Sequence, residues 1–173
     1  MRSIIRKSIL AVGLLCVCMT VHAQSHSNRV SVGMGALYER GFDATLSVEH
    51  ETENHNAWEY FLNGYVKYSK DSSVGHITHD SFWNDYNTWG LGVAYKPCVY
   101  RGKNNYGSLR LGASAGSDRH EAVGWVNLGY EQDYALRSGW HLFCQVKTDV
   151  SINGRDLFRT GVVLGFKLPV SKR

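Results

Sequence analysis

The chain has 173 residues, of which 43% are hydrophobic and 20% are charged, and it contains only 2 prolines. One domain is the expectation for this length, and the hydrophobic content excludes an intrinsically disordered chain. The 18 glycines, 10 tyrosines and 5 tryptophans favour β-structure over helices, which are built mostly from Ala, Leu, Glu and Lys.

The N-terminal residues predict an exported protein. Three basic residues in the first seven positions precede an apolar run over residues 9–21. This run is too short for a membrane-spanning helix and is typical of a secretory signal peptide. We therefore predict a signal peptide at residues 1–23, cleaved between Ala23 and Gln24.

The predicted mature chain, residues 24–173, is almost electrically neutral. Of the 19 Lys and Arg residues, 3 belong to the signal peptide, so 16 basic side chains remain against 15 acidic ones. A nucleic-acid-binding surface needs a basic patch or stripe, so direct nucleic-acid binding is not expected. Cys98 and Cys144 also remain after cleavage. A disulfide between them suits an exported protein, but we expect unpaired thiols, because Cys144 falls on the apolar side of its segment.

Apolar residues alternate with polar or small ones throughout the mature chain, as Val30, Val32 and Met34 do with Ser31 and Gly33. Such alternation is the period of a β-strand with two different faces. It recurs in eight segments, at residues 29–36, 42–49, 58–68, 89–96, 108–115, 125–131, 140–147 and 159–167. No apolar run of 18 residues and no sustained 3.6-residue period follows Gln24, which excludes transmembrane helices and a helical bundle.

The polar faces of these segments combine charges of both signs with Gly, Ser and Asn, and their charged members are Arg29, Asp43, Glu49, Glu59, Lys67, Arg110, Glu131, Lys147, Asp149, Arg159 and Lys167. A water-facing exterior would be richer in charge and poorer in glycine. Aromatic residues such as Trp58 and Trp140 stand near strand ends on the apolar face, as in outer-membrane girdles. We therefore predict that residues 24–173 form an all-β, eight-stranded antiparallel up-and-down outer-membrane β-barrel. A soluble β-barrel with its apolar face inside is the alternative.

The charged faces of such a barrel would meet in a narrow lumen. Buried ions are costly unless they are paired, and eight strands leave an interior just wide enough for side chains. We therefore predict a lumen charge network, with Arg110, Glu131, Lys147 and Arg159 among its members, that plugs the barrel rather than lining a pore.

With the N-terminus in the periplasm, the outward connections lie at residues 37–41, 69–85, 116–120 and 151–156. The longest is 69–85, which we expect to be a contact loop through His76, His79, Phe82 and Trp83. Its two histidines have no third fixed ligand, so no metal is expected. His120 follows Ser117 and Asp118, but adjacency in sequence is not the geometry of a catalytic triad.

The last predicted strand carries an outer-membrane insertion signal, in which a polar residue, a glycine, an apolar residue and an aromatic residue stand at fixed spacing. Arg159, Gly161, Leu164 and Phe166 occupy these four positions. The aromatic residue usually ends the chain, whereas residues 167–173 follow here.

Three glycine-rich segments carry a resemblance to a known family. They read WGLGVAY at residues 89–95, SLRLGASAG at 108–116 and GVVLGFK at 161–167. In these segments the chain resembles the TraO conjugal-transfer proteins of Bacteroidetes conjugative transposons. The resemblance implies a place in the envelope part of a type IV secretion-like mating apparatus, and it carries over no active-site residue.

The expected function is therefore a structural component of a conjugative DNA-transfer apparatus. The partners would be outer-membrane lipid and other transfer-apparatus proteins, with no cofactor and no small-molecule substrate. Two alternatives stay open: a general OmpX/OmpA-like surface barrel for adhesion or envelope integrity, and a lipid A-modifying barrel enzyme. The enzyme would need His120 and a serine to meet at the outer rim, and we do not expect catalysis.

Overall fold

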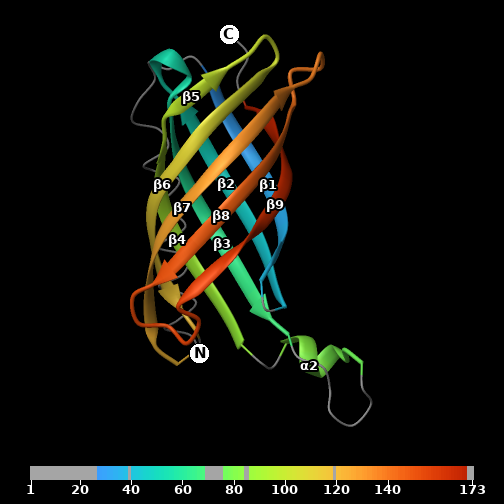
Figure 1. Ribbon diagram of the computed structural model, residues 1–173, viewed down its shortest axis with the longest axis vertical. Coiled ribbons are helices and arrows are strands. Elements are labelled where there is room, and N and C mark those ends of the chain that lie inside the picture. The colour runs from blue at the N-terminus through green and yellow to red at the C-terminus, as the bar shows by residue number, and fades with distance from the viewer. Residues whose placement is uncertain (1–26, 39, 69–75, 84–85, 119, 171–173) are drawn as a thin grey trace.

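Eight long antiparallel strands close into a barrel in the described part of the chain (Figure 1). The computed structural model describes residues 27–38, 40–68, 76–83, 86–118 and 120–170. The barrel strands are β1 (Ser27–Leu37), β2 (Gly41–Glu51), β3 (Ala57–Lys67), β4 (Tyr86–Lys96), β6 (Asn105–Ser117), β7 (Ala122–Ala135), β8 (His141–Ser151) and β9 (Phe158–Pro169). Each pairs with its neighbours in chain order, and the β1–β9 pairing closes the ladder. The predicted all-β, eight-stranded up-and-down barrel is confirmed.

Three short elements lie outside this ladder. Strand β5 (Cys98–Arg101) continues the pairing with β6 beyond the end of β4. Pro97 separates β4 from β5, because proline has no N–H to donate to a sheet ladder. A 3-10 turn, η1 (Glu53–His55), joins β2 to β3, and helix α2 (His79–Trp83) lies within the long β3–β4 connection. Within the described residues, no helix is long and apolar enough to cross a membrane.

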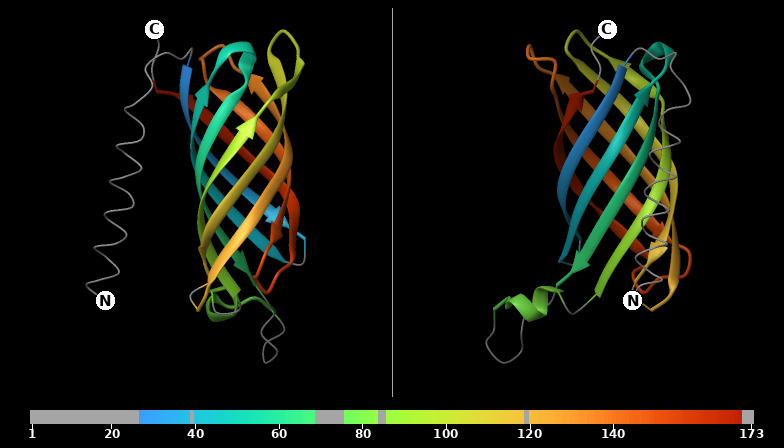
Figure 2. Two further views of the ribbon diagram at one scale, coloured as in Figure 1. Left: turned by 90° about the vertical axis from the view of Figure 1, so that its left-hand side faces the viewer. Right: turned by 180° about the vertical axis from the view of Figure 1, so that it is seen from behind.

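The two ends of the barrel differ in what they carry. One end of the barrel, which we call the loop end, carries helix α2 and four connections (Figure 1). These are the β1–β2, β3–β4, β6–β7 and β8–β9 connections. The start of β1 and the end of β9 lie at the opposite end, the terminal end (Figure 2). The four connections of the loop end are those that the sequence predicts to lie at one end of the barrel. The predicted signal peptide and its cleavage between Ala23 and Gln24 fall outside the described residues.

Side chains alternate between the lumen and the outer wall along every barrel strand. On β8, Lys147 is 4% exposed while the neighbouring Val146 is 52% exposed. Asp43 on β2 is fully buried. The charged face therefore points inward and the apolar face outward, which rules out the alternative of a barrel with an apolar interior.

The lumen also holds large aromatic rings, and one of them is the buried ring of Trp125 on β7. Phe61, Tyr65, Tyr86 and Phe143 are buried there as well. Glycines make room for these rings. A Cβ placed on Gly33, for example, would lie 2.9 Å from Phe143 Cζ. The same holds where Gly90 faces Trp125 and Gly92 faces Phe61, so at these positions glycine leaves room for a ring from another strand.

Candidate functional site

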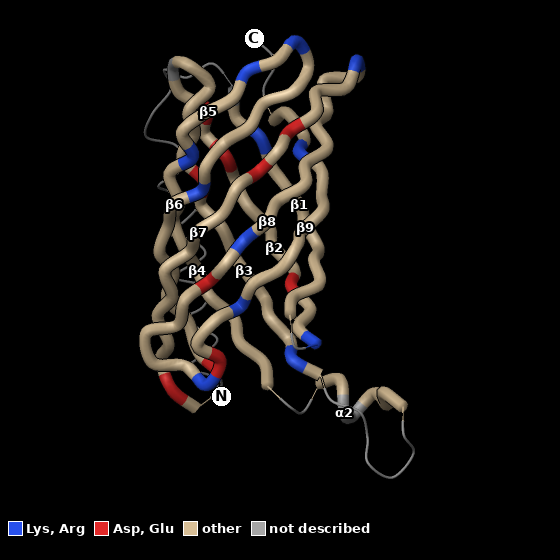
Figure 3. Tube along the Cα trace, viewed as in Figure 1, with Lys and Arg blue, Asp and Glu red and all other residues tan. Residues whose placement is uncertain are grey.

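Charged residues of both signs are distributed along the strands over the length of the barrel (Figure 3). Near the terminal end, Lys96 from β4 and Lys167 from β9 share two carboxylates. Glu49 accepts from both lysines, at 2.7 Å and 2.8 Å. Glu131 also pairs with both, and Asp133 accepts from Lys167 at 2.6 Å. These five side chains bridge strands that are not neighbours in the sheet, so they tie opposite walls of the barrel together.

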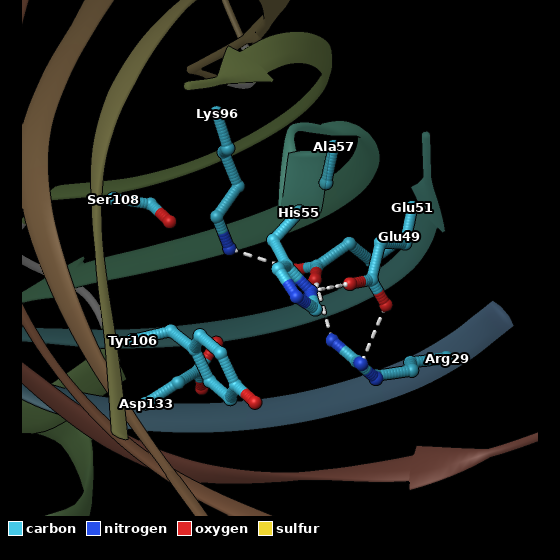
Figure 4. A pocket seen from close by; sticks show the side chains of 9 residues that line it. All are labelled: Arg29, Glu49, Glu51, His55, Ala57, Lys96, Tyr106, Ser108 and Asp133. Carbon is cyan, nitrogen blue, oxygen red and sulfur yellow. Dashed lines mark hydrogen bonds and ion pairs between the residues drawn. The ribbon is translucent and has the colours of Figure 1, made fainter. Parts of the chain in front are cut away.

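A pocket opens beside this cluster at the terminal end (Figure 4). Arg29 lies 2.6 Å from Glu51 and 3.5 Å from Glu49, and Glu51 is 2.5 Å from His55 Nδ1. The His55 ring lies 4.8 Å from the Tyr106 ring. The pocket is lined by Arg29, Glu49, Glu51, His55, Ala57, Lys96, Tyr106, Ser108 and Asp133. Its acidic and basic groups are bonded to one another, so the pocket wall continues the lumen network.

In the middle of the lumen, each cation has its own acidic partner. Arg110 Nε donates to Glu59 at 2.6 Å, and its guanidinium lies 4.2 Å from the centre of the Phe61 ring. Lys147 lies 2.9 Å from Asp43 and 2.8 Å from Asp149. The lumen is thus filled by ion pairs and rings, the arrangement that makes buried charges tolerable.

Toward the loop end, Arg159 is held mainly by aromatic rings. Its guanidinium lies 4.1 Å from the centre of the Tyr65 ring and 4.9 Å from that of Trp125. Arg159 Nη1 donates to Thr88 Oγ1 at 2.8 Å. Tyr65 in turn donates to Asp156 in the β8–β9 connection. A cation between aromatic faces is stabilised by their quadrupoles, so Arg159 fastens three strands and one connection at this end.

The structure places all four predicted lumen residues inside the barrel but in separate clusters. Glu131 belongs to the terminal end, Arg110 and Lys147 to the middle, and Arg159 to the loop end. The predicted lumen network does not include Lys96. Its place next to Tyr95, which falls on the apolar face of the alternating pattern, nevertheless points Lys96 inward. The predicted network also omits Glu51 and Asp133, each of which lies two residues beyond the end of a predicted strand.

The residues of the predicted insertion signal divide between the two faces of β9. Arg159 and Gly161 face the lumen, whereas Leu164 and Phe166 face outward, and Leu164 is 60% exposed. The Phe166 ring stacks on Trp140 with 6.3 Å between ring centres. Strand β9 continues past Phe166 to Pro169, so Lys167 belongs to the lumen network and not to a tail after the strand.

The named residues of the predicted contact loop are mostly exposed. His76, His79 and Trp83 are exposed, and Phe82 is half-buried against the barrel. No group of three or more His, Cys, Asp or Glu residues in the described part of the chain could hold a metal ion.

Asp118 and His120 meet through the backbone of the β6–β7 connection. The carboxylate of Asp118 accepts from the backbone N–H groups of His120 and Glu121, at 3.1 Å and 2.8 Å. These donors hold the pKa of the Asp118 carboxyl below its ordinary value. The contact is therefore a turn cap made through the backbone. Cys98 and Cys144 are separate thiols, and Cys144 faces the outer wall of β8.

The outer wall of the barrel carries an apolar band rimmed by aromatic residues. Trp58 and Tyr95 pack at 5.1 Å near the terminal end, and Trp140 stacks on Phe166 at the same end. Exposed apolar side chains of the band include Met34, Leu46, Leu62, Trp89, Val93, Leu111, Leu128, Leu142, Val146, Val162 and Leu164. Outer-membrane barrels present this kind of surface to lipid.

No family model matches the chain, and no curated protein matches it. In structure, the chain is similar to a major outer membrane protein from Thermus thermophilus. The TM-score is 0.51 at 14% sequence identity, and the match covers 83% of this chain and 100% of that one. The likeness is one of fold, and the fold is that of an outer-membrane-type β-barrel.

Proposed function

We propose that this protein is an integral outer-membrane barrel whose role is structural and protein-contacting rather than catalytic. One observation carries the proposal: the barrel has an apolar, aromatic-rimmed outer wall around a lumen filled by ion pairs such as Lys147–Asp43. A closed β-ladder leaves no unpaired backbone edge for lipid to meet. The filled lumen favours a scaffold over a channel.

We further propose that the barrel serves in the envelope part of a conjugative DNA-transfer apparatus, with outer-membrane lipid and other transfer proteins as its partners. The support for this finer role is the resemblance of residues 89–95, 108–116 and 161–167 to the TraO conjugal-transfer proteins. The near-neutral charge of residues 24–173 agrees with contacts to protein rather than to DNA.

The membrane part of the proposal is tested by fractionation and electrophoresis. The mature protein should sediment with the outer membrane, and unboiled samples should migrate differently from boiled ones, because a closed eight-stranded ladder resists detergent until it is heated. Recovery of the mature protein as a soluble periplasmic species would contradict membrane residence.

The transfer part is tested by deleting the gene from a donor strain and measuring mating frequency. We expect transfer to fall and to return when the wild-type gene is supplied in trans. Antibiotic permeability of the same deletion strain tests the alternative that the protein is a general surface barrel for envelope integrity. Unchanged mating together with increased permeability would replace the transfer role with one in envelope integrity.

A further inference from the structure

Helix α2 lies at the loop end of the barrel and contacts outward-facing rings at the start of β2 and just after the end of β3. The Phe82 ring stacks on Tyr68 with 5.5 Å between ring centres and lies 6.4 Å from the Phe42 ring. Asp43, next to Phe42 in the chain, binds Lys147 inside the lumen, and Lys67, next to Tyr68, binds Asp156 at the loop end of the lumen. The alternation therefore points Phe42 and Tyr68 outward. Figure 1 shows α2 to one side of the barrel, beyond the strand ends, and not across its mouth.

The height of α2 on the barrel matches one edge of a lipid bilayer. Along β3 and its extension, Trp58 belongs to the aromatic rim at the terminal end and Tyr68 to the loop end. At about 3.3 Å per residue and a strand tilt of about 40°, these two residues are separated by about 25 Å along the barrel axis. That is the height of the apolar band of an outer-membrane barrel. Tyr68 and Phe82 therefore stand where the opposite aromatic rim belongs.

The groups that α2 leaves exposed are those of an interfacial segment. Trp83 meets Phe82 edge-on at 5.0 Å, yet it is 46% exposed, and Ile77 is also 46% exposed. Arg40, in the β1–β2 connection, is also exposed, and its carbonyl accepts from the Tyr68 backbone N–H. Tryptophan prefers the bilayer interface, and arginine suits the phosphate groups there.

We propose that α2, with Ile77 and Trp83, is a lateral membrane anchor that binds lipid at the headgroup level on the loop side of the membrane. The anchor is continuous with the apolar band through Phe42 and Tyr68, and this continuity favours lipid over a protein as its occupant. The inference rests on the proposed membrane location and assigns lipid to a segment that the sequence predicts to be a contact loop.

Three variants with a single tryptophan test this anchor in lipid nanodiscs. One variant keeps Trp83 and replaces the other four tryptophans with phenylalanine, and two matched variants keep only Trp89 or only Trp125. Trp89 is exposed on the band, and Trp125 is buried in the lumen. Lipids brominated on the acyl chain close to the headgroup should lower the fluorescence of Trp83 and Trp89 about two-fold and leave Trp125 nearly unchanged. Heat-modified migration on gels checks that each variant is folded.

The outcomes separate the anchor from the membrane location itself. If Trp89 is quenched by brominated lipid while Trp83 responds only to aqueous acrylamide, α2 faces water and the anchor is wrong. If neither Trp83 nor Trp89 is quenched in a folded variant, the proposed membrane location fails instead. Should the tryptophan variants not fold, a fluorophore on Ile77→Cys in a Cys98→Ser, Cys144→Ser background reports the same quenching.

Discussion

The ammonium group of Lys147 on β8 lies 2.9 Å from the carboxylate of Asp43 on β2, across two intervening strands. The two residues are 104 positions apart in the sequence, and both are buried. Lys147 also binds Asp149. Replacing it leaves two carboxylates without their cation, so we expect Lys147→Met to lower the free energy of unfolding by about 3–5 kcal/mol. Urea unfolding of the folded barrel in detergent measures this change.

The matched control for Lys147→Met is Lys103→Met, since Lys103 is exposed in the β5–β6 connection. It should change the free energy of unfolding by no more than about 0.5 kcal/mol. Adding Asp43→Asn to Lys147→Met should recover part of the loss, because one unpaired charge is removed. Equal effects of the two lysine substitutions would show that the lumen pair contributes no stability.

The packing of Phe143 against Gly33 predicts that the lumen tolerates no added methyl group there. A Cβ on Gly33 would lie 2.9 Å from Phe143 Cζ and 2.9 Å from Val163 Cγ1. We expect Gly33→Ala to lower the free energy of unfolding by about 1–3 kcal/mol through overpacking. The control is Gly64→Ala, where the nearest heavy atom to a new Cβ is 3.9 Å away. Adding Phe143→Leu to Gly33→Ala should recover part of the lost free energy of unfolding. If nothing is recovered, the Phe143 ring is not the source of the strain.

The aromatic cage around Arg159 predicts a requirement for the planar guanidinium, and not only for positive charge. Lysine cannot lie flat against both Tyr65 and Trp125 or keep the same bond to Thr88. We expect Arg159→Lys to cost about 1–2 kcal/mol of unfolding free energy. Arg155→Lys, at an exposed position of the same barrel end, is the control. Comparable unfolding midpoints for both variants would contradict the cage.

The insertion signal is tested separately from stability. Phe166→Ala and Gly161→Val should reduce the amount of inserted protein, whereas Arg159→Lys keeps a polar residue in the signal and should insert at the wild-type level. The last strand offers an unpaired edge to an assembly factor before it pairs with β1, which is why its residues should matter most. Outer-membrane yield measures the effect, with Arg137→Ala as a control in an exposed turn. Normal yield of the Phe166→Ala, Gly161→Val double variant would remove the signal from β9.

The filled lumen predicts negligible conductance in planar bilayers. Arg110, Glu131, Lys147 and Arg159 lie in bonded clusters at different heights of the lumen. Because eight strands leave an interior just wide enough for side chains, we expect these clusters to block the passage of ions. Large and stable single-channel currents from the purified barrel would contradict this expectation. Bilayers treated with detergent alone provide the baseline.

The barrel, its number of strands and the face that turns inward could all be predicted from the amino-acid sequence. Alternation with a period of two is a local property, and a one-residue shift would move every charged side chain to the lipid face. The pattern therefore predicts that Asp43 and Lys147 face the lumen and that Leu164 faces outward, without knowledge of any contact. Because the strands are antiparallel in chain order, alternate connections are also expected to lie at the same end of the barrel.

The contacts between inward-facing residues could not be predicted from the sequence and depend on how the barrel closes. Lys147 reaches Asp43 across two strands, and Phe143 fills the space left by Gly33, because strand tilt and register bring distant positions to one height in the lumen. The same holds for α2: the composition of residues 69–85 indicates an exposed connection, but the structure packs Phe82 against Tyr68, just after the end of β3. Periodicity assigns a side chain to a face, whereas its partner on that face depends on how the closed sheet is staggered.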